Sequence, residues 1–231
     1  SGHYATMCER LIPRLTPSSR GQTMLLSATL TAELLKKSEL RSLVRLKQLA
    51  FVVPEEEEVE GKLPSLAQVN PAGLRHSWIA CETGRKEEQL AAILAALPTP
   101  CRIIVFVNAV EAVGHQVSLL RQFGFGQRAV VGLHAHLQQR QRLQHLDRFR
   151  ADPSGILVAS DVAARGLDLP AVDWVIHLHV ARTLPLYQHR AGRSGRAGRA
   201  GNSLVLVSPD EAKWWRTLQP AIQWQPLELL L

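Results

Sequence analysis

The strongest constraint on the fold is a regular alternation of short apolar runs with amphipathic stretches, which begins near Leu74 and continues to about Leu218. The apolar runs are rich in Val, Ile and Leu, as in strands that are buried on both faces. The stretches between them place apolar residues three or four positions apart, which is typical of helices that cover one side of a sheet. This order predicts an α/β fold in which helices sandwich a parallel sheet.

The same patterns give approximate boundaries for the elements. Strands are expected at residues 75–81, 102–107, 129–134, 156–159, 174–178 and 203–207. Helices are expected at residues 85–97, 111–123 and 138–150, and a final helix is expected from Ser208 onward. The third helix should bury Leu143, Leu146 and Phe149, and Trp214 and Trp215 of the last helix favour a core role over a base-stacking one.

Charge and cysteine usage narrow the class of protein. The chain has 231 residues, a formal net charge of +7 and a pI near 9.8, which favours an anionic partner such as nucleic acid. No apolar run is long enough to span a bilayer, and the amino end has no signal-peptide pattern. Cys8, Cys81 and Cys101 are far apart and form no Cys-x-x-Cys pair, so we expect reduced thiols, no metal site and a reducing, intracellular compartment.

The densest functional signal is a run of arginines at every third position between Tyr187 and Gly201. Its members are Arg190, Arg193, Arg196 and Arg199, with glycines between them and no acidic residue in the run. Like charges at this spacing repel one another on a helix, and guanidinium groups suit phosphate oxygens, so the run predicts an anionic ligand. A solvated basic turn or a non-specific nucleic-acid patch would show the same charges, and the run alone does not separate these from a phosphate site.

Further candidate residues follow the predicted strands, where parallel sheets bind their ligands. Asn108 ends the second strand, and Ser160 and Asp161 follow the fourth and can cap a short helix whose amides face a phosphate. Gln139 and Arg142 lie one turn apart at the start of a helix, where an amide beside a guanidinium can bind a sugar-phosphate backbone. His177 and His179 alternate on one strand, but no carboxylate or cysteine completes a metal-ligand set.

Three longer stretches together resemble the DEAD-box RNA helicases. His189-Arg190-x-Gly192-Arg193-x-Gly195-Arg196 is similar to the sixth motif of the family, and the stretch from Leu157 to Pro170 is similar to the fifth. Ser27-Ala28-Thr29 is similar to the third motif. The resemblance implies a RecA-like fold, with ATP, Mg²⁺ and RNA as ligands.

Roles carried over from the family divide into three groups. Arg193 and Arg196 are expected to reach the terminal phosphate of ATP, and Gly166 and Asp168 to contact the nucleotide. RNA contacts are expected from Asn108, Gln139, Arg142, Ser160, Asp161 and Gly166. Coupling between the two halves of the active site is expected from Ser27, Thr29, Arg165 and His189.

The resemblance also implies a domain organisation. Residues 1–53 are expected to be the carboxyl-terminal remnant of a first RecA-like domain, and residues 54–73, rich in Glu, Pro and Gly, a linker. Residues 74–218 are expected to form the second RecA-like domain, and residues 219–231 an apolar tail that docks on the domain or on a partner. The sequence contains no Gly-x-x-x-x-Gly-Lys-Ser/Thr loop and no Asp-Glu-Ala-Asp, so we expect a catalytically silent fragment whose missing first domain holds most of the ATP and Mg²⁺ contacts.

Taken together, the sequence predicts the carboxyl-terminal half of an enzyme that uses ATP to clamp and locally unwind RNA through backbone contacts, without base readout. The segments His177-x-His179-x-x-Arg182-Thr183 and Asp161-Val-Ala-Ala-Arg165 resemble the nucleolar branch that assembles the large ribosomal subunit. This suggests a nucleolar location and pre-ribosomal particles as partners. Two alternatives remain: an RNA-binding scaffold that needs no hydrolysis, and a DNA-directed helicase of the same superfamily.

Overall fold

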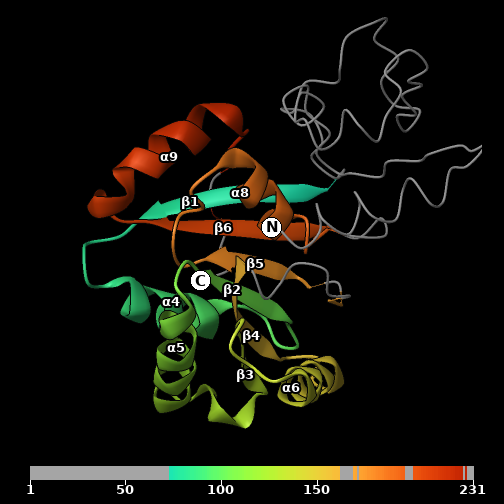
Figure 1. Ribbon diagram of the computed structural model, residues 1–231. Coiled ribbons are helices and arrows are strands. Elements are labelled where there is room, and N and C mark those ends of the chain that lie inside the picture. Colours follow the sequence, from blue (N-terminus) through green and yellow to red (C-terminus); the bar gives the residue numbers. More distant parts are fainter. Residues whose placement is uncertain (1–72, 162–168, 171, 196–199, 226, 228–231) are drawn as a thin grey trace, which may run out of the picture. The chain divides into compact units, whose positions relative to one another are not determined.

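All six strands of the domain lie in one parallel sheet (Figure 1). The computed structural model describes residues 73–161, 169–170, 172–195, 200–225 and 227. Within these residues the strand order is β1-β6-β5-β2-β4-β3. The strands are β1 (Leu74–Ala80), β2 (Ile103–Val107), β3 (Val130–Leu133), β4 (Ile156–Ser160), β5 (Trp174–His177) and β6 (Gly201–Val207). The predicted parallel α/β sheet is therefore confirmed.

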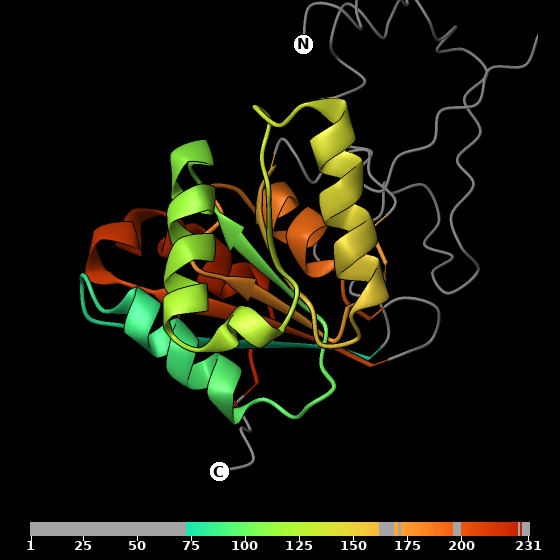
Figure 2. The same cartoon turned by 90° about the horizontal axis from the view of Figure 1, so that it is seen from below.

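Helices cover both faces of this sheet. The helices are α4 (Lys86–Ala96), α5 (Val110–Gln122), α6 (Gln139–Ala151), α8 (Leu184–Ala191) and α9 (Ala212–Leu218), with short 3₁₀ turns at Phe125–Gln127, Pro209–Glu211 and Gln219–Ala221. Figure 2 shows α4 and α5 on one side of the sheet and α6 on the other. The α8 and α9 helices pack with β1 and β6 through a cluster that includes Leu74, Val205 and Trp215.

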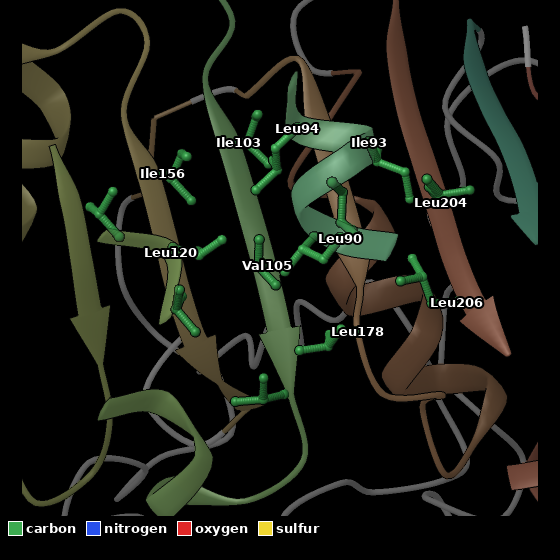
Figure 3. Packing of buried hydrophobic residues seen from close by; sticks show 14 of the residues in the cluster. Leu90, Ile93, Leu94, Ile103, Val105, Leu120, Ile156, Leu178, Leu204 and Leu206 are labelled. Carbon is green, nitrogen blue, oxygen red and sulfur yellow. The ribbon is translucent and has the colours of Figure 1, made fainter. Parts of the chain in front are cut away.

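The central strands are apolar throughout because both of their faces are covered. Every residue of β2 and β4 is buried, and successive side chains alternate between the two faces. Ile103 and Val105 of β2 pack under α4 and α5, whereas Ile104 and Phe106 pack with α6. Figure 3 shows the first of these clusters, where leucines of α4 meet β2 and β6. This burial is the main driving force that fixes the sheet and therefore the places of the loops at its carboxyl edge.

Two local features differ from the sequence-based expectations. Leu143 was predicted to be buried, but 48% of its surface is exposed, whereas Leu146 and Phe149 are buried as predicted. β3 is the edge strand of the sheet, and the hydrogen bond of α6 to it, from His145 to the Gly132 carbonyl, comes two residues after Leu143. The second difference is α8, which was not predicted; it starts at the Thr183 cap, whose hydroxyl accepts the Leu186 N–H, and has Pro185 in its first turn.

The end of the chain packs on the domain as far as the structure describes it. Trp215 is buried and Trp214 is half-buried, in agreement with the predicted core role. Ile222 and Trp224 pack against the cluster under α8 and α9, and Leu227 packs against the cluster under α4 and α5. Residues 1–53 and 54–73 were predicted to be a domain remnant and a linker; residues 1–72 lie outside the described part, so both assignments stay predictions.

Candidate functional site

The carboxyl ends of β5, β2 and β4 lie side by side and are joined by one buried arginine. Arg190 of α8 is only 1% exposed. Its Nε and Nη2 donate to the two oxygens of Asp161 over 2.6 and 2.7 Å, and Nη2 also donates to Asn108 Oδ1 over 2.7 Å. Its Nη1 donates to the His179 carbonyl over 2.9 Å. We call Arg190, Asp161, Asn108 and His179 the α8 hub; it fastens α8 to the ends of three neighbouring strands.

The hub corrects one inference from the sequence. The arginine run was taken to need an anionic ligand because no acidic residue lies within it, but for Arg190 the counter-charge is Asp161, 29 positions earlier in the chain. The bidentate contact and the stack of Arg190 on Phe106, 5.2 Å from the guanidinium carbon to the ring centre, make this a well-satisfied buried charge. Arg190 is therefore a structural residue.

The remaining members of the hub fix each other. Asn108 donates its backbone N–H to His179 Nδ1 over 3.2 Å and its amide N–H to the Val180 carbonyl over 3.1 Å. Burial is the main cause that lowers the pKa of His179 below its ordinary value. Since Nδ1 accepts a hydrogen bond, the neutral ring carries its proton on Nε2.

A second buried ion pair lies at the ends of β5 and β6. Lys86 and Glu211 are 6% and 4% exposed and their side chains form a direct salt bridge. Lys86 Nζ also donates to the carbonyls of Leu178 and Leu206 over 2.9 and 2.8 Å, and Glu211 accepts the Val180 N–H over 3.0 Å. We call Lys86 and Glu211, with these partners, the α4 hub.

The turn after α8 carries the predicted finger residue Arg193. Its N–H donates to the Arg190 carbonyl over 3.0 Å, and its own carbonyl accepts the Val172 N–H over 3.4 Å. Ser194 is fully buried, and its hydroxyl donates to the carbonyls of Val172 and Asp173 and accepts the Asn202 N–H. A Cβ at Gly201 would overlap Ser194 and the backbone of Gly195, so this close approach requires glycine.

The other predicted residues are placed as follows. The side chain of Ser160 is buried and its hydroxyl has no partner among the described residues. Gln139 and His189 are exposed, on α6 and α8, and Arg142 is half-buried on α6. Six predicted site residues lie outside the described part of the chain: Ser27, Thr29, Arg165, Gly166, Asp168 and Arg196.

Comparisons with known proteins agree with this geometry. Residues 85–198 match the family model of the helicase conserved C-terminal domain. An ATP-dependent RNA helicase ddx24 of Dictyostelium discoideum is 34% identical over 215 residues, which are 90% of this chain and 22% of that protein. This domain is the C-terminal domain of a DEAD-box RNA helicase. Its sheet is the RecA-like fold of that family.

Two further relatives, one a curated sequence and one a solved structure, are similar to this chain. The ATP-dependent RNA helicase mak5 of Aspergillus oryzae is 34% identical over 85% of this chain and 27% of its own length. The DEAD-box protein SrmB of E. coli, solved bound to regulator of ribonuclease activity A, has a TM-score of 0.59 at 29% identity and covers 67% of this chain and 91% of that one. The chain thus spans about a quarter of the length of the curated helicases it matches.

Three further features of the helicase domain concern metal ligation, the cysteines and the hydropathy of the helices. In the described residues, His, Cys, Asp and Glu side chains form no set of three suited to a metal ion. Cys81 and Cys101 are buried and free of disulfides; burial raises the pKa of both thiols, that of Cys101 to about 12. None of the described helices is long and apolar enough to cross a bilayer.

Sequence reasoning missed part of the site. It named Asn108 and Asp161 as RNA contacts but gave no signal that both engage Arg190, and it assigned no role to Lys86 or Glu211. These partners lie between 29 and 125 positions apart, beyond the reach of any local pattern. No local pattern in the sequence marked Lys86 and Glu211 as partners.

Proposed function

We propose that the whole protein is an ATP-dependent RNA helicase in which this domain closes over a nucleotide held mainly by the first RecA-like domain. The observation that carries the proposal is the α8 hub. It holds α8 against the strand ends, and the turn that follows α8 is bonded to Val172 and Asp173 directly before β5, so the position of Arg193 relative to the sheet is fixed.

On the nucleotide side, the proposed role of Arg193 and Arg196 is to face the terminal phosphate of ATP. ATP with its Mg²⁺ supplies the phosphoryl group that is transferred to water. Guanidinium groups stabilise the negative charge that spreads over the transferred group, and they keep their own charge at every relevant pH. Gly166 and Asp168 are proposed to contact the nucleotide, and Mg²⁺ is proposed to be bound by the first domain.

On the RNA side, the described residues fit a ligand with many hydrogen-bonding oxygens. A buried hydroxyl without a partner costs free energy, so the Ser160 side chain favours a polar ligand at the end of β4. The Asp161 carboxylate is used by Arg190, so its proposed RNA contact is through the backbone at the helix start. Asn108, Gln139, Arg142 and Gly166 complete the proposed RNA contacts.

Contacts between the two halves of the enzyme form a third group. Ser27 and Thr29 are proposed to couple hydrolysis to RNA binding from the first domain, and Arg165 to hold the closed form together. His189 is exposed on α8, where a second domain can reach it. The linker at residues 54–73 is proposed to allow this closure.

A role in ribosome assembly is also proposed. It rests on the likeness of the segment His177-x-His179-x-x-Arg182-Thr183 to the nucleolar branch of the family. Tagged protein should then locate to the nucleolus and co-sediment with pre-ribosomal particles. Co-sedimentation with mature ribosomes alone would contradict this assignment.

The deciding experiment is RNA-stimulated ATP hydrolysis by the full-length protein with Arg193→Ala. Loss of an arginine finger should lower kcat by about 10³-fold or more, with RNA binding retained. Arg182→Ala is the matched control, because Arg182 is an exposed arginine that stacks on Trp214, 5.6 Å from the ring centre. Unchanged hydrolysis in Arg193→Ala would support the scaffold alternative.

Two further measurements use the same assay. DNA in place of RNA should not stimulate hydrolysis, and equal stimulation by DNA would favour the DNA-directed alternative. The 231-residue chain alone should hydrolyse no ATP, because its sequence has neither the phosphate loop nor the Asp-Glu-Ala-Asp motif.

A further inference from the structure

A chain of buried polar side chains lies beneath α8, and the proposed function does not use it. Tyr187 of α8 hydrogen bonds through its hydroxyl with His76 Nδ1 of β1 (2.7 Å) and with Ser203 Oγ of β6 (3.0 Å). Ser203 Oγ in turn hydrogen bonds with His177 Nε2 of β5 over 3.1 Å. All four residues are at most 3% exposed. Buried polar groups cost free energy unless they are hydrogen bonded, so these bonds specify one position for the Tyr187 ring.

Stacking continues this network into the α8 hub. The His177 ring lies nearly parallel to the Tyr187 ring, with 4.7 Å between centres and 21° between planes. The His177 ring also lies 6.2 Å from the Phe106 ring between centres, and the Arg190 guanidinium lies over that Phe106 ring. Tyr187 and Arg190 are three residues apart on the same helix. The helix is therefore held at two points one turn apart, which fixes both its depth and its rotation.

Any displacement of α8 is passed directly to the turn that follows it. Arg193 is hydrogen bonded to Arg190 through the backbone, and Ser194 is held between Val172, Asp173 and Asn202. Catalytic groups are sensitive to such shifts, because a misplacement of about 1 Å can cost about 10²-fold in rate.

The segment after α9 packs against this network of buried polar side chains. Trp224 meets the rings of His76 and Tyr187 edge-on, with 6.3 and 5.8 Å between centres, and lies 4.9 Å from Trp215. The Gln225 N–H donates to the His76 carbonyl over 2.7 Å, at the outer edge of β1. Leu227 then packs on the opposite face of the sheet from Trp224. The segment thus wraps around the edge strand that carries His76.

We propose that Trp224 and Tyr187 are positioning residues for the catalytic arginine: Trp224 holds the His76–Tyr187 pair in place, and this pair sets the position of α8 and of Arg193. The inference rests on the proposed function, in which Arg193 completes the ATP site. It gives the apolar tail a role within the domain, in place of a docking site for another protein.

The test uses the full-length protein with Trp224→Ala in RNA-stimulated ATP hydrolysis, under conditions where thermal unfolding shows it to be folded. We expect kcat to fall about tenfold or more, with the KM for ATP changed less than twofold. Trp214→Ala is the matched control, since Trp214 is also half-buried in the cluster under α9 but stacks with Arg182. It should lower the melting temperature to a similar extent and leave kcat unchanged.

A double-mutant cycle separates positioning from general stability. Tyr187→Phe keeps the ring and removes the two hydrogen bonds of its hydroxyl. If Trp224 acts through Tyr187, the double variant should have the kcat of the more impaired single variant. Independent, multiplicative effects on kcat, or an unchanged kcat in Trp224→Ala, would overturn the inference.

Arg193→Ala in the same assay distinguishes the two possible failures. If Arg193→Ala retains full hydrolysis, the proposed function fails and the inference fails with it. If Arg193→Ala abolishes hydrolysis while Trp224→Ala leaves kcat unchanged, only the positioning role is refuted.

Discussion

The carboxyl edge of the sheet holds two buried ion pairs that differ in what surrounds them. In the α4 hub, Lys86 donates to the carbonyls of Leu178 and Leu206, and Glu211 accepts from the Val180 N–H and the Ser208 hydroxyl. The Lys86 and Glu211 side chains are 8% and 5% exposed. In the α8 hub, the partners of Arg190 include Asn108 and Asp161, which are candidate RNA contacts, and the Asp161 side chain is 18% exposed.

The difference indicates a division of labour along one edge. The α4 hub ties strand ends to a helix start and to a 3₁₀ turn, and it presents no group to a ligand. The α8 hub ties strand ends to the helix that precedes Arg193, so any change in it alters the ligand-binding edge as well as the fold. Changes in the α4 hub should therefore affect stability alone, whereas changes in the α8 hub should affect both stability and activity.

The largest effect is expected from Lys86→Met in the α4 hub. The change leaves Glu211 buried without its counter-charge, which should lower the free energy of unfolding by about 3–5 kcal/mol. Urea unfolding of the 231-residue chain measures it, with the exposed Lys213→Met as control. Replacing both partners, in Lys86→Met with Glu211→Leu, should restore much of the loss. A loss below about 1 kcal/mol would mean that water reaches this pair.

The next largest effect is expected from acid, which should lower the stability of the fold through the buried histidines beneath α8. Burial lowers the pKa of His76 to about 4 and that of His177 well below its ordinary value, so the folded state holds both rings neutral. Below about pH 6.5 the unfolded state binds more protons than the folded state, and stability therefore falls as the pH falls toward 4. For His76 the full shift corresponds to about 3 kcal/mol.

Urea unfolding between pH 7.5 and 4.5 measures this dependence. His76→Gln keeps an amide beside the Tyr187 hydroxyl but cannot titrate, so its stability should fall less steeply with acid. An identical slope in the two proteins would assign the acid sensitivity to other groups.

How much of this edge could be predicted from sequence depended on the range of the signal. Apolar periodicity is local, and it predicted every strand of the described sheet to within two residues. The short helix α8 was missed because its periodic pattern is only two turns long and is followed by glycines. The burial of Leu143 was wrong because periodicity shows which face of α6 is apolar but not that the strand next to it, β3, is the edge strand of the sheet.

The candidate site, too, could be predicted only where its signal is local in the sequence. The motif around Arg193 predicted the helicase family, but the sequence could not show that its first arginine is neutralised inside the domain. That contact depends on β4 and α8 meeting in space, which follows from the order of the strands and not from any spacing along the chain.

Asp161→Asn in the α8 hub is expected to have a smaller effect on stability, but it should lower both stability and ATP hydrolysis. The variant keeps the size of the side chain and removes the charge that faces Arg190, which should cost about 2 kcal/mol. It should also lower RNA-stimulated ATP hydrolysis by the folded full-length protein. Asp147→Asn is the control, because Asp147 pairs with Arg150 on the surface and should contribute at most about 0.5 kcal/mol. Unchanged hydrolysis in Asp161→Asn would remove the distinction between the two hubs.

The smallest effect is expected from Ser208→Ala in the α4 hub. The Ser208 hydroxyl donates to Glu211 over 3.4 Å, a long hydrogen bond to a carboxylate that already has Lys86 as a partner. Its removal should lower the free energy of unfolding by only about 0.5 kcal/mol and leave hydrolysis by the full-length protein unchanged. Reduced hydrolysis in a variant of near-normal stability would show that the α4 hub also affects the ligand-binding edge. The two hubs adjoin at Val180, whose N–H donates to Glu211 and whose carbonyl accepts from the Asn108 amide.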